Sequence, residues 1–286
     1  MSHIHDDKVK ELEHKATEIR EDIISMLLEA GSGHSAGPLG MADVFTALYF
    51  DIMHHDPKNP SWEDRDRLIL SCGHICPVRY AAMAHAGYFP REELMTLRKF
   101  GSRLQGHPER LRLPGTETTS GPLGEGLGQG AGMAYVAKMD GKKWRTYVVL
   151  SDGEHEEGLH WEAVMFAGKY QLDNLTAIVD RNHIQIDGTT EHIMPLEPFK
   201  AKYEAFNWNV IEIDGNDIRA IVEATNLAKA VHERPTLIIA NTIPGRGVDF
   251  MENDYTWHGK PPNKAEADEA LKRLRTLDGK ITSEHE

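Results

Sequence analysis

The sequence predicts an α/β fold class, with a doubly wound parallel sheet flanked by helices. In the second half of the chain, apolar runs rich in β-branched residues alternate with helical patterns, as in βαβ units. The runs are continuously apolar rather than alternating, which is typical of strands covered on both faces. The expected strands are 146–150, 175–179, 209–213 and 236–240, and the expected helices between them are 157–171, 196–206 and 217–231.

The N-terminal part of the chain predicts two helices and a short strand. Apolar residues recur at three- and four-residue steps over 8–30, which indicates an amphipathic helix, and Gly31 is a typical stop. A second apolar helix is expected over 41–53. Residues 56–66 have the composition of a turn, and the apolar run 67–70 after them is a candidate strand. We expect the two helices to pack alongside the sheet.

A long glycine- and proline-rich segment follows over 101–132. Within a compact protein, an irregular segment of this length is more typical of a binding loop than of a linker. From Glu125 to about Lys138 the pattern becomes that of a helix built from small residues. No linker, internal repeat or low-complexity tract divides the sequence, so we expect one domain.

The composition limits the class of protein. The chain has 286 residues, 40% of them hydrophobic, and a formal net charge of −13. The apolar fraction suffices for a sizeable core, whereas the acidic balance argues against nucleic acid or anionic membrane as partners. The sequence has no apolar run of about 18 residues and no secretory signal at its N-terminus, so a cytoplasmic enzyme is expected. The cysteines, Cys72 and Cys76, form no disulfide framework and are expected to be small loop residues.

Polar residues follow two neighbouring strands of the predicted sheet. Asp152 and Gly153 come directly after one strand, and Asn182 follows the next. Parallel strands end at one edge of the sheet, where ligands bind in open α/β folds. Carboxylate, amide and backbone carbonyl oxygens suit Mg²⁺ or Ca²⁺, and a glycine lets the backbone approach a phosphate. The alternative is that Asp152 caps the next helix and Asn182 lies in a turn.

These residues also resemble the thiamine diphosphate fingerprint, Gly-Asp-Gly followed about thirty residues later by Asn, with Ser151 in place of the first glycine. Further stretches, in family order, resemble the transketolase family and extend over about 30–260. They are GSGHSAGPLGMADVF (31–45), NPSWEDRDRLILSCGH (59–74), QGHPE (105–109), ETTSGPLGEG (117–126), SDGEHEEGLHWEA (151–163), DRNHIQIDG (180–188) and WHG (257–259).

The resemblance implies the thiamine-diphosphate-binding Thi-fold and half of a split transketolase. Residues 1–286 would form a single diphosphate-binding (PP) domain, with 262–286 as C-terminal helix and tail. The pyrimidine and C-terminal domains are then expected on a separate partner chain, a C-terminal transketolase subunit, in an α2β2 heterotetramer. The activity implied is transfer of a two-carbon ketol unit from a ketose phosphate to an aldose phosphate in the pentose phosphate pathway, and only with that partner. The alternatives are a related enzyme acting on a different ketose and a catalytically silent, cofactor-binding regulatory subunit.

The resemblance also implies the cofactor contacts. Asp152, Asn182 and the backbone carbonyl of Ile184 would hold Mg²⁺, with Ca²⁺ or Mn²⁺ as substitutes, on the diphosphate of the cofactor. The amide of Gly153 would meet a phosphate oxygen. The aminopyrimidine would face the three residues Gly121, Pro122 and Leu123.

Four histidines lie in or beside glycine-bearing loops, and imidazole suits proton transfer near pH 7. The resemblance implies that His34, His107 and His258 bind sugar hydroxyls and move protons, and that His74 and His258 approach the diphosphate. A zinc site is the alternative, but the four lack the short spacing of most zinc sites. The imidazoles argue against a purely structural subunit. The remaining histidines, including His3, His5, His14 and His155, are expected at the surface.

Two glutamates, Glu157 and Glu162, lie at the start of the predicted helix that follows Asp152 and Gly153. A solvated acidic helix start, favourable with the helix dipole, is one interpretation. The resemblance implies instead that both join a carboxylate cluster across a subunit interface, and we favour this second interpretation.

Overall fold

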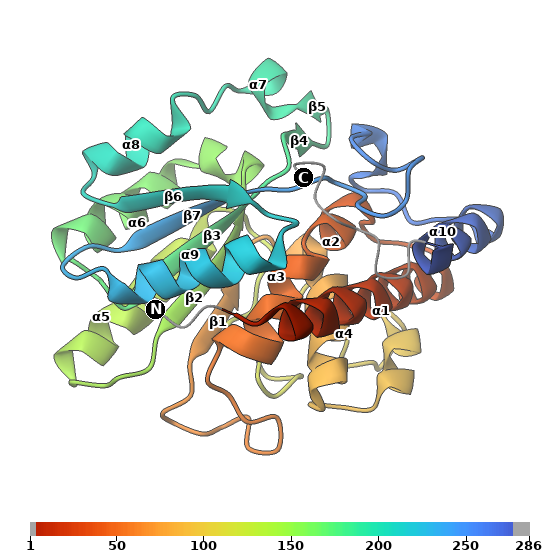
Figure 1. Cartoon of the computed structure of the whole chain (residues 1–286), viewed down its shortest axis with the longest axis horizontal. Coiled ribbons are helices and arrows are strands. Elements are labelled where there is room, and N and C mark those ends of the chain that lie inside the picture. The colour runs from red at the N-terminus through yellow and green to blue at the C-terminus, as the bar shows by residue number, and fades with distance from the viewer. Residues whose placement is uncertain (1–3, 277–286) are drawn as a thin grey trace.

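The structure, a computed structural model, describes residues 4–276 of the chain. Its centre is a five-stranded parallel sheet with the order β1-β2-β3-β7-β6 (Figure 1). The predicted fold class and the five predicted strands are confirmed. The strands are β1 (Arg67–Leu70), β2 (Thr146–Ser151), β3 (Leu175–Arg181), β6 (Asn209–Asp214) and β7 (Thr236–Asn241).

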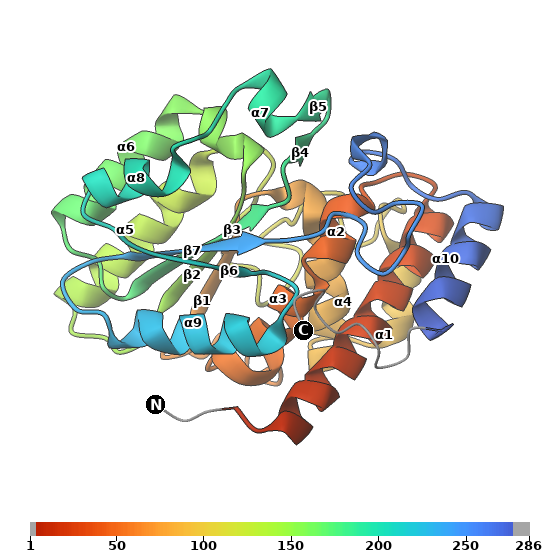
Figure 2. The ribbon, with the colours of Figure 1, turned by 45° about the horizontal axis from the view of Figure 1, so that its top comes forward.

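Helices cover both faces of the sheet, as the continuously apolar strands require. Figure 2 shows α5, α6 and α8 on one face and α1, α3, α4 and α9 on the other, with α10 beside α1. A separate apolar core fills each side, and β2, β3 and the apolar residues of β7 are buried between them. The helices are α1 (Asp6–Ala30), α2 (Ala36–Gly40), α3 (Ala42–Ala47), α4 (Cys76–Ala86), α5 (Glu125–Met139), α6 (Gly158–Lys169), α7 (Thr190–Ile193), α8 (Phe199–Ala205), α9 (Ile218–Ala230) and α10 (Lys264–Thr276).

Some predicted boundaries were wrong. The helix expected over 41–53 is divided into α3 and a π-helical turn, Leu48–Ile52, which ends where the Met53 N–H donates to the Leu48 carbonyl at 3.0 Å. The helix expected over 157–171 begins one residue later and ends at Lys169. No sequence pattern indicated α2 or the two-residue strands of the hairpin β4 (Ile184–Gln185) and β5 (Gly188–Thr189). Within the expected tail, 277–286 lies outside the described residues.

The cysteines are not both loop residues. Both are buried, and Cys76 begins α4, where its thiol donates to the Gly106 carbonyl at 3.2 Å. The prediction for Cys76 was wrong because a helix begins at this residue, and its thiol contacts the loop that carries Gly106. Burial raises the pKa of the Cys76 thiol to about 12.

The glycines of α5 allow this helix to approach the sheet closely. A Cβ atom at Gly130 would overlap the side chain of Val148 on β2, and one at Gly126 would overlap Ser71 at the end of β1. Larger side chains would therefore push α5 away from the strands. This explains why the segment predicted as a small-residue helix is also rich in glycine.

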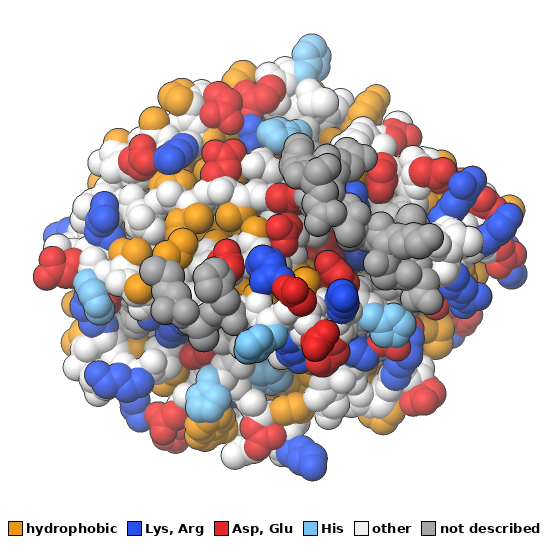
Figure 3. Space-filling model, in the orientation of Figure 1, with side chains coloured by type: hydrophobic (Ala, Val, Ile, Leu, Met, Phe, Trp, Pro, Cys, Tyr) orange, Lys and Arg blue, Asp and Glu red, His pale blue; other side chains and the backbone are white. Residues whose placement is uncertain are grey.

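The carboxyl ends of the strands meet at one edge. Ser151 at the end of β2 pairs in register with Asp180 on β3, and the Asp152 N–H donates to the Asp180 carbonyl at 3.2 Å. The residues after both strands are thereby adjacent. Charged side chains of both signs are interspersed on the face shown in Figure 3. Within residues 4–276, no helix is both long enough and apolar enough to cross a bilayer.

Candidate active site

A pocket of about 430 Å³ opens at the carboxyl edge of the sheet. This volume lies in the range of small-molecule and cofactor sites, roughly 300–1,000 Å³. The structure brings most of the predicted site residues to its wall: His34, His74, His107, Gly121, Leu123, Asp152, Gly153, Glu157, Asn182, Ile184 and His258. Pro122 and Glu162 do not line the pocket and are exposed. The hairpin β4–β5 contributes Gln185, which the sequence did not single out.

Three of the four histidines form a compact triangle, although they come from distant parts of the chain. His34 follows α1, and His74 lies in the turn between β1 and α4. The ring centroids of these two are 4.9 Å apart, and that of His258 is 5.5 Å from His34 and 5.3 Å from His74. His107 reaches the same pocket from the loop before α5.

The pKa values of all four histidines are lowered, so their imidazoles are mainly neutral at pH 7, although His107 is exposed. Burial, reinforced by the nearby His258, Arg98 and His107, lowers the pKa of His34 to about 4. Burial also lowers the pKa values of His74, His107 and His258. Buried Nδ1 of His34 has no hydrogen-bond partner among the described residues, so this nitrogen is open to a bound hydroxyl. Neutral imidazoles can accept or donate a proton in hydrogen bonds to sugar hydroxyls.

The part of the chain that the structure describes gives no support for the zinc alternative. No group of three or more His, Cys, Asp or Glu side chains there is arranged to hold a metal ion. The close histidine rings are packed against one another, with interplanar angles of 39–84°.

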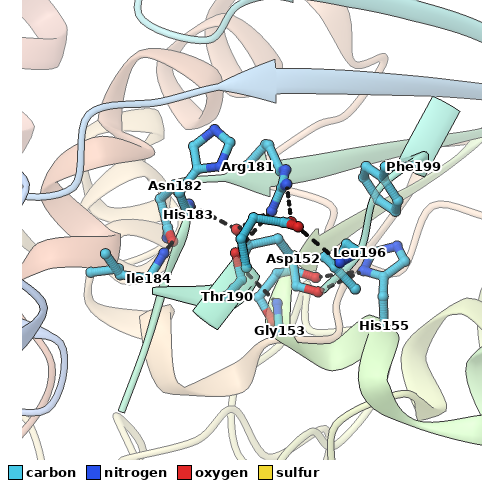
Figure 4. A network of polar contacts seen from close by, with 12 residues as sticks. Asp152, Gly153, His155, Arg181, Asn182, His183, Ile184, Thr190, Leu196 and Phe199 are labelled. Carbon is cyan, nitrogen blue, oxygen red and sulfur yellow. Dashed lines mark hydrogen bonds and ion pairs between the residues drawn. The ribbon is translucent and has the colours of Figure 1, made fainter. Parts of the chain in front are cut away.

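The loop after β2 is fixed by Asp152, which is buried. Its Oδ1 accepts from the Gly153 N–H at 2.8 Å, and its Oδ2 accepts from the His183 N–H at 2.8 Å (Figure 4). Burial raises the pKa of the Asp152 carboxyl to about 6, against the lowering effect of Arg181 and of both amides. Asp152 therefore caps the short helical turn Gly153–Glu156, but not α6, the helix that the alternative interpretation expected it to cap.

The oxygen donors at this edge fit a divalent cation. Oδ1 of Asp152 accepts a single hydrogen bond, which leaves one lone pair for a cation. Asn182 lies beside it, with Oδ1 accepting from the Ile184 N–H at 3.0 Å and Nδ2 donating to Asp180 at 2.8 Å. Few hard oxygen ligands suit a Mg²⁺ ion that completes its shell with water and phosphate oxygens. Capping and metal binding are thus compatible roles of Asp152.

Arg181 is a site residue that the sequence analysis missed. Its buried guanidinium donates to Oδ2 of Asp152 at 3.2 Å and to the Thr190 hydroxyl at 3.0 Å. It also donates to Glu191 at 2.7 Å and to Glu197 at 3.1 Å. Arg181 thus joins the loop after β2 to the segment that carries α7. Its position between Asp180 and Asn182 was a signal, but its partners were not visible in the sequence.

Glu154 was also missed, and it joins three segments beneath the pocket. Its buried carboxylate accepts from the Ser71 hydroxyl at 2.5 Å and from the Ser151 N–H at 2.8 Å. The Gly124 N–H donates to it at 3.3 Å. The glycine-rich loop is therefore tied to the ends of β1 and β2 at the point where it enters α5.

The prediction that His155 lies at the surface was wrong. The chain turns inward after β2, and α8 covers the imidazole, which is buried. Its Nδ1 lies 2.9 Å from the Ser151 carbonyl, and its Nε2 lies 2.8 Å from the Tyr203 hydroxyl. His160 Nε2 lies 2.6 Å from the same hydroxyl. His160 was also expected at the surface and is fully buried, so the prediction was wrong for it too. His5 and His14 are exposed, and His3 lies outside the described residues.

These contacts fix the direction of each hydrogen bond. A carbonyl can only accept, so Nδ1 of His155 donates to Ser151 and its Nε2 must accept from the Tyr203 hydroxyl. The hydroxyl then accepts from Nε2 of His160. The resulting chain of hydrogen bonds runs from α6 through α8 to the backbone at the end of β2. Burial lowers the pKa of His155 to about 3, so the ring is neutral at pH 7. Its Nδ1 therefore remains a donor and its Nε2 an acceptor.

We expect Tyr203→Phe to lower the free energy of unfolding by about 1–3 kcal/mol, because it leaves His155 and His160 each with an unpaired buried nitrogen. Tyr147→Phe is the matched control, since the buried Tyr147 hydroxyl has no hydrogen-bond partner among the described residues. Urea unfolding followed by circular dichroism measures both. Equal losses in the two variants would contradict a stabilising role for the chain of hydrogen bonds.

The outer faces of α5 and α6 are uncovered in this chain. Glu157 and Glu162 are exposed there. Apolar side chains lie on the same helices, with exposed fractions of 52% for Val136, 48% for Leu159 and 55% for Met165. This surface combines apolar side chains with two carboxylates. It is compatible both with a solvated acidic helix start and with a subunit interface.

Comparison with known proteins identifies the family. Residues 13–279 match the family model described as "Transketolase, thiamine diphosphate binding domain". The chain is 39% identical over 278 residues to one subunit of the apulose-4-phosphate transketolase of Phocaeicola vulgatus, covering 97% of this chain and 99% of that one. It is 44% identical over 248 residues to the 6-deoxy-6-sulfo-D-fructose transketolase subunit SqwG of Clostridium sp., covering 87% and 90%.

Solved structures agree with these relatives. A transketolase from Pichia stipitis in complex with sedoheptulose 7-phosphate superposes with a TM-score of 0.85 at 36% identity. The match covers 95% of this chain but 40% of that transketolase, so the chain spans less than half the length of the solved enzyme. Fold, sequence and the family model thus point to one conclusion. The chain belongs to the transketolase family and contains its thiamine diphosphate binding domain.

Proposed function

We propose that this chain is the N-terminal, diphosphate-binding half of a split transketolase. Together with a partner chain that carries the pyrimidine domain, it transfers a two-carbon ketol unit from a ketose phosphate to an aldose phosphate. The observation that carries this proposal is the pocket, in which four neutral histidines face the oxygen donors Asp152 and Asn182. When bound, thiamine diphosphate supplies the nucleophile and the electron sink for this reaction.

The residues of this chain would bind the cofactor and handle protons. Asp152, Asn182 and the Ile184 carbonyl would hold Mg²⁺ on the diphosphate, with His74 and His258 close by. In the structure the Gly153 amide, expected at a phosphate, donates to Asp152. The cofactor's phosphate would then share that amide with the carboxylate.

The histidines of the pocket would bind the sugar. His34, His107 and His258 would hold the sugar hydroxyls and move their protons, since a neutral imidazole can accept a proton from a hydroxyl. The loop residues Gly121 and Leu123 line the pocket beside them and would face the aminopyrimidine.

A different ketose is a second candidate substrate. The two relatives described above are named for apulose 4-phosphate and for 6-deoxy-6-sulfo-D-fructose. These names weaken the assignment to the pentose phosphate pathway. Assay of the assembled protein with phosphorylated, branched and sulfonated ketoses separates the candidates.

The partner would cover the uncovered faces of α5 and α6. Glu157 and Glu162 would then meet acidic groups of another subunit, where neighbouring carboxylates share protons. Both relatives described above are named as subunits of their enzymes, which supports the existence of a partner chain. We expect two copies of this chain and two of the partner.

Light scattering of the two co-produced chains tests this assembly, and a ketol-transfer assay tests the activity. We expect a heterotetramer that is active, and an isolated chain that is inactive. Full activity of the isolated, monomeric chain would contradict the split enzyme. An assembly that binds thiamine diphosphate but turns over no ketose would favour the regulatory alternative.

A further inference from the structure

Arg98 lies in a strained position between two loops of the active site. Its backbone has φ of 61°, a left-handed conformation that is unfavourable for a residue with a side chain. The Arg98 N–H donates to the Leu104 carbonyl at 2.9 Å, which holds this conformation. Such strain persists where the surrounding structure requires it, and it is concentrated at functional sites.

The side chain of Arg98 packs across the glycines of the two histidine loops. A Cβ atom at Gly106 would lie 2.8 Å from Cζ and 2.9 Å from Nε of Arg98. One at Gly33 would lie 3.7 Å from the same Nε. Gly33 directly precedes His34, and Gly106 directly precedes His107. The absence of side chains at both positions therefore leaves room for the Arg98 side chain against the backbone that carries the two histidines.

Arg98 has no carboxylate partner among the residues that the structure describes. Two nearby arginines have carboxylate partners: Arg91 donates to Asp22 at 2.6 Å, and Arg103 donates to Glu93 at 2.6 Å. Within residues 4–276, by contrast, no carboxylate forms an ion pair with Arg98, which is exposed. Its positive charge helps to lower the pKa values of His34 and His107, as expected for a cation near both rings.

We propose that Arg98 is a specificity-determining residue that binds the anionic group, phosphate or sulfonate, of a sugar held by His34 and His107. A guanidinium is suited to this role because it presents a rigid fork of donors to a tetrahedral oxyanion. The proposal rests on the proposed function, since it names the substrate class of the same pocket. It adds a contact for the charged end of the sugar from the chain that also carries the histidines.

The test is Arg98→Met in the assembly with the partner chain. We expect kcat/KM for a phosphorylated and for a sulfonated ketose to fall about 10- to 100-fold, mainly through KM, because a charge-assisted hydrogen bond is lost. For a neutral ketose of the same length, kcat/KM should change by less than about threefold. Arg98→Lys should retain part of the preference for anionic ketoses.

Lys99→Met is the matched control, because it removes the same charge one residue away, where Lys99 pairs with Glu29. Gly106→Ala provides a second variant, since it displaces the guanidinium without removing it, and it should reproduce the loss for anionic ketoses. A loss for one anionic ketose alone supports the proposal and identifies the group that Arg98 binds.

Two results would overturn the proposal: equal losses for anionic and neutral ketoses, and no loss at all. If the wild-type assembly transfers no ketol group, the proposed function fails. Calorimetric titration of the assembly with the same ketoses then still decides the role of Arg98. Binding of the anionic ketoses that Arg98→Met weakens would support it, and binding that the variant leaves unchanged would refute it.

Discussion

Asp152→Ala will abolish Mg²⁺-dependent binding of thiamine diphosphate without unfolding the domain. Asp152 supplies the charged member of the three proposed metal ligands, and its Oδ1 has a lone pair left for the ion. The fold should survive because β2 is held by the apolar core on both of its faces. The glutamates that also pair with Arg181 would keep its guanidinium from being left without a partner.

Calorimetric titration of the assembled protein with thiamine diphosphate, with and without Mg²⁺, measures this effect. Asp173→Ala is the control, because Asp173 lies in the turn before β3, at the opposite end of the strand from the pocket. Unchanged affinity in Asp152→Ala would contradict the metal assignment. If the alanine variant fails to fold, Asp152→Asn keeps the shape and removes the charge, and it should lose the Mg²⁺ dependence alone.

His34→Ala and His258→Ala should each lower turnover by roughly 10²–10⁴, the usual contribution of a positioned acid or base. Both rings line the pocket, and their centroids are 5.5 Å apart. Cofactor affinity should fall less for His34→Ala than for His258→Ala, because only His258 is proposed to approach the diphosphate.

The pH dependence of the His34 variant gives a further check. Because the pKa of His34 is lowered to about 4, its imidazole is already neutral at pH 6. The loss of turnover in His34→Ala should therefore be the same at pH 6 and pH 8. Steady-state kinetics of the assembly, with the exposed His232→Ala as control, measures it. Near-wild-type rates in both histidine variants would return these residues to an ordinary structural role.

The strands could be predicted closely because burial on both faces leaves a strong pattern. The strand expected over 236–240 is Thr236–Asn241 in the structure, and the one expected over 67–70 is Arg67–Leu70. The hairpin β4–β5 could not be predicted in this way, since its two-residue strands are too short to show any periodicity.

The site was predictable where one local rule was enough. Asp152 and Asn182 could be placed together because each follows a strand, and parallel strands end at the same edge. The proximity of His34 to His258 came from family resemblance, since no local pattern relates them. His155 was placed wrongly because the burial of a polar side chain depends on its partner, and Tyr203 follows many residues later.

The proximity of His34 and His258 has a consequence for protein synthesis. The adjacent Ser35 hydroxyl donates to the Lys260 carbonyl at 2.6 Å, across 225 positions of the sequence. Contacts between such distant residues form late, because the intervening chain must first be ordered. On the ribosome, β1, β2 and β3 can begin to pair while the pocket still lacks one wall. A nascent chain would thus acquire its affinity for cofactor only after Lys260 has emerged.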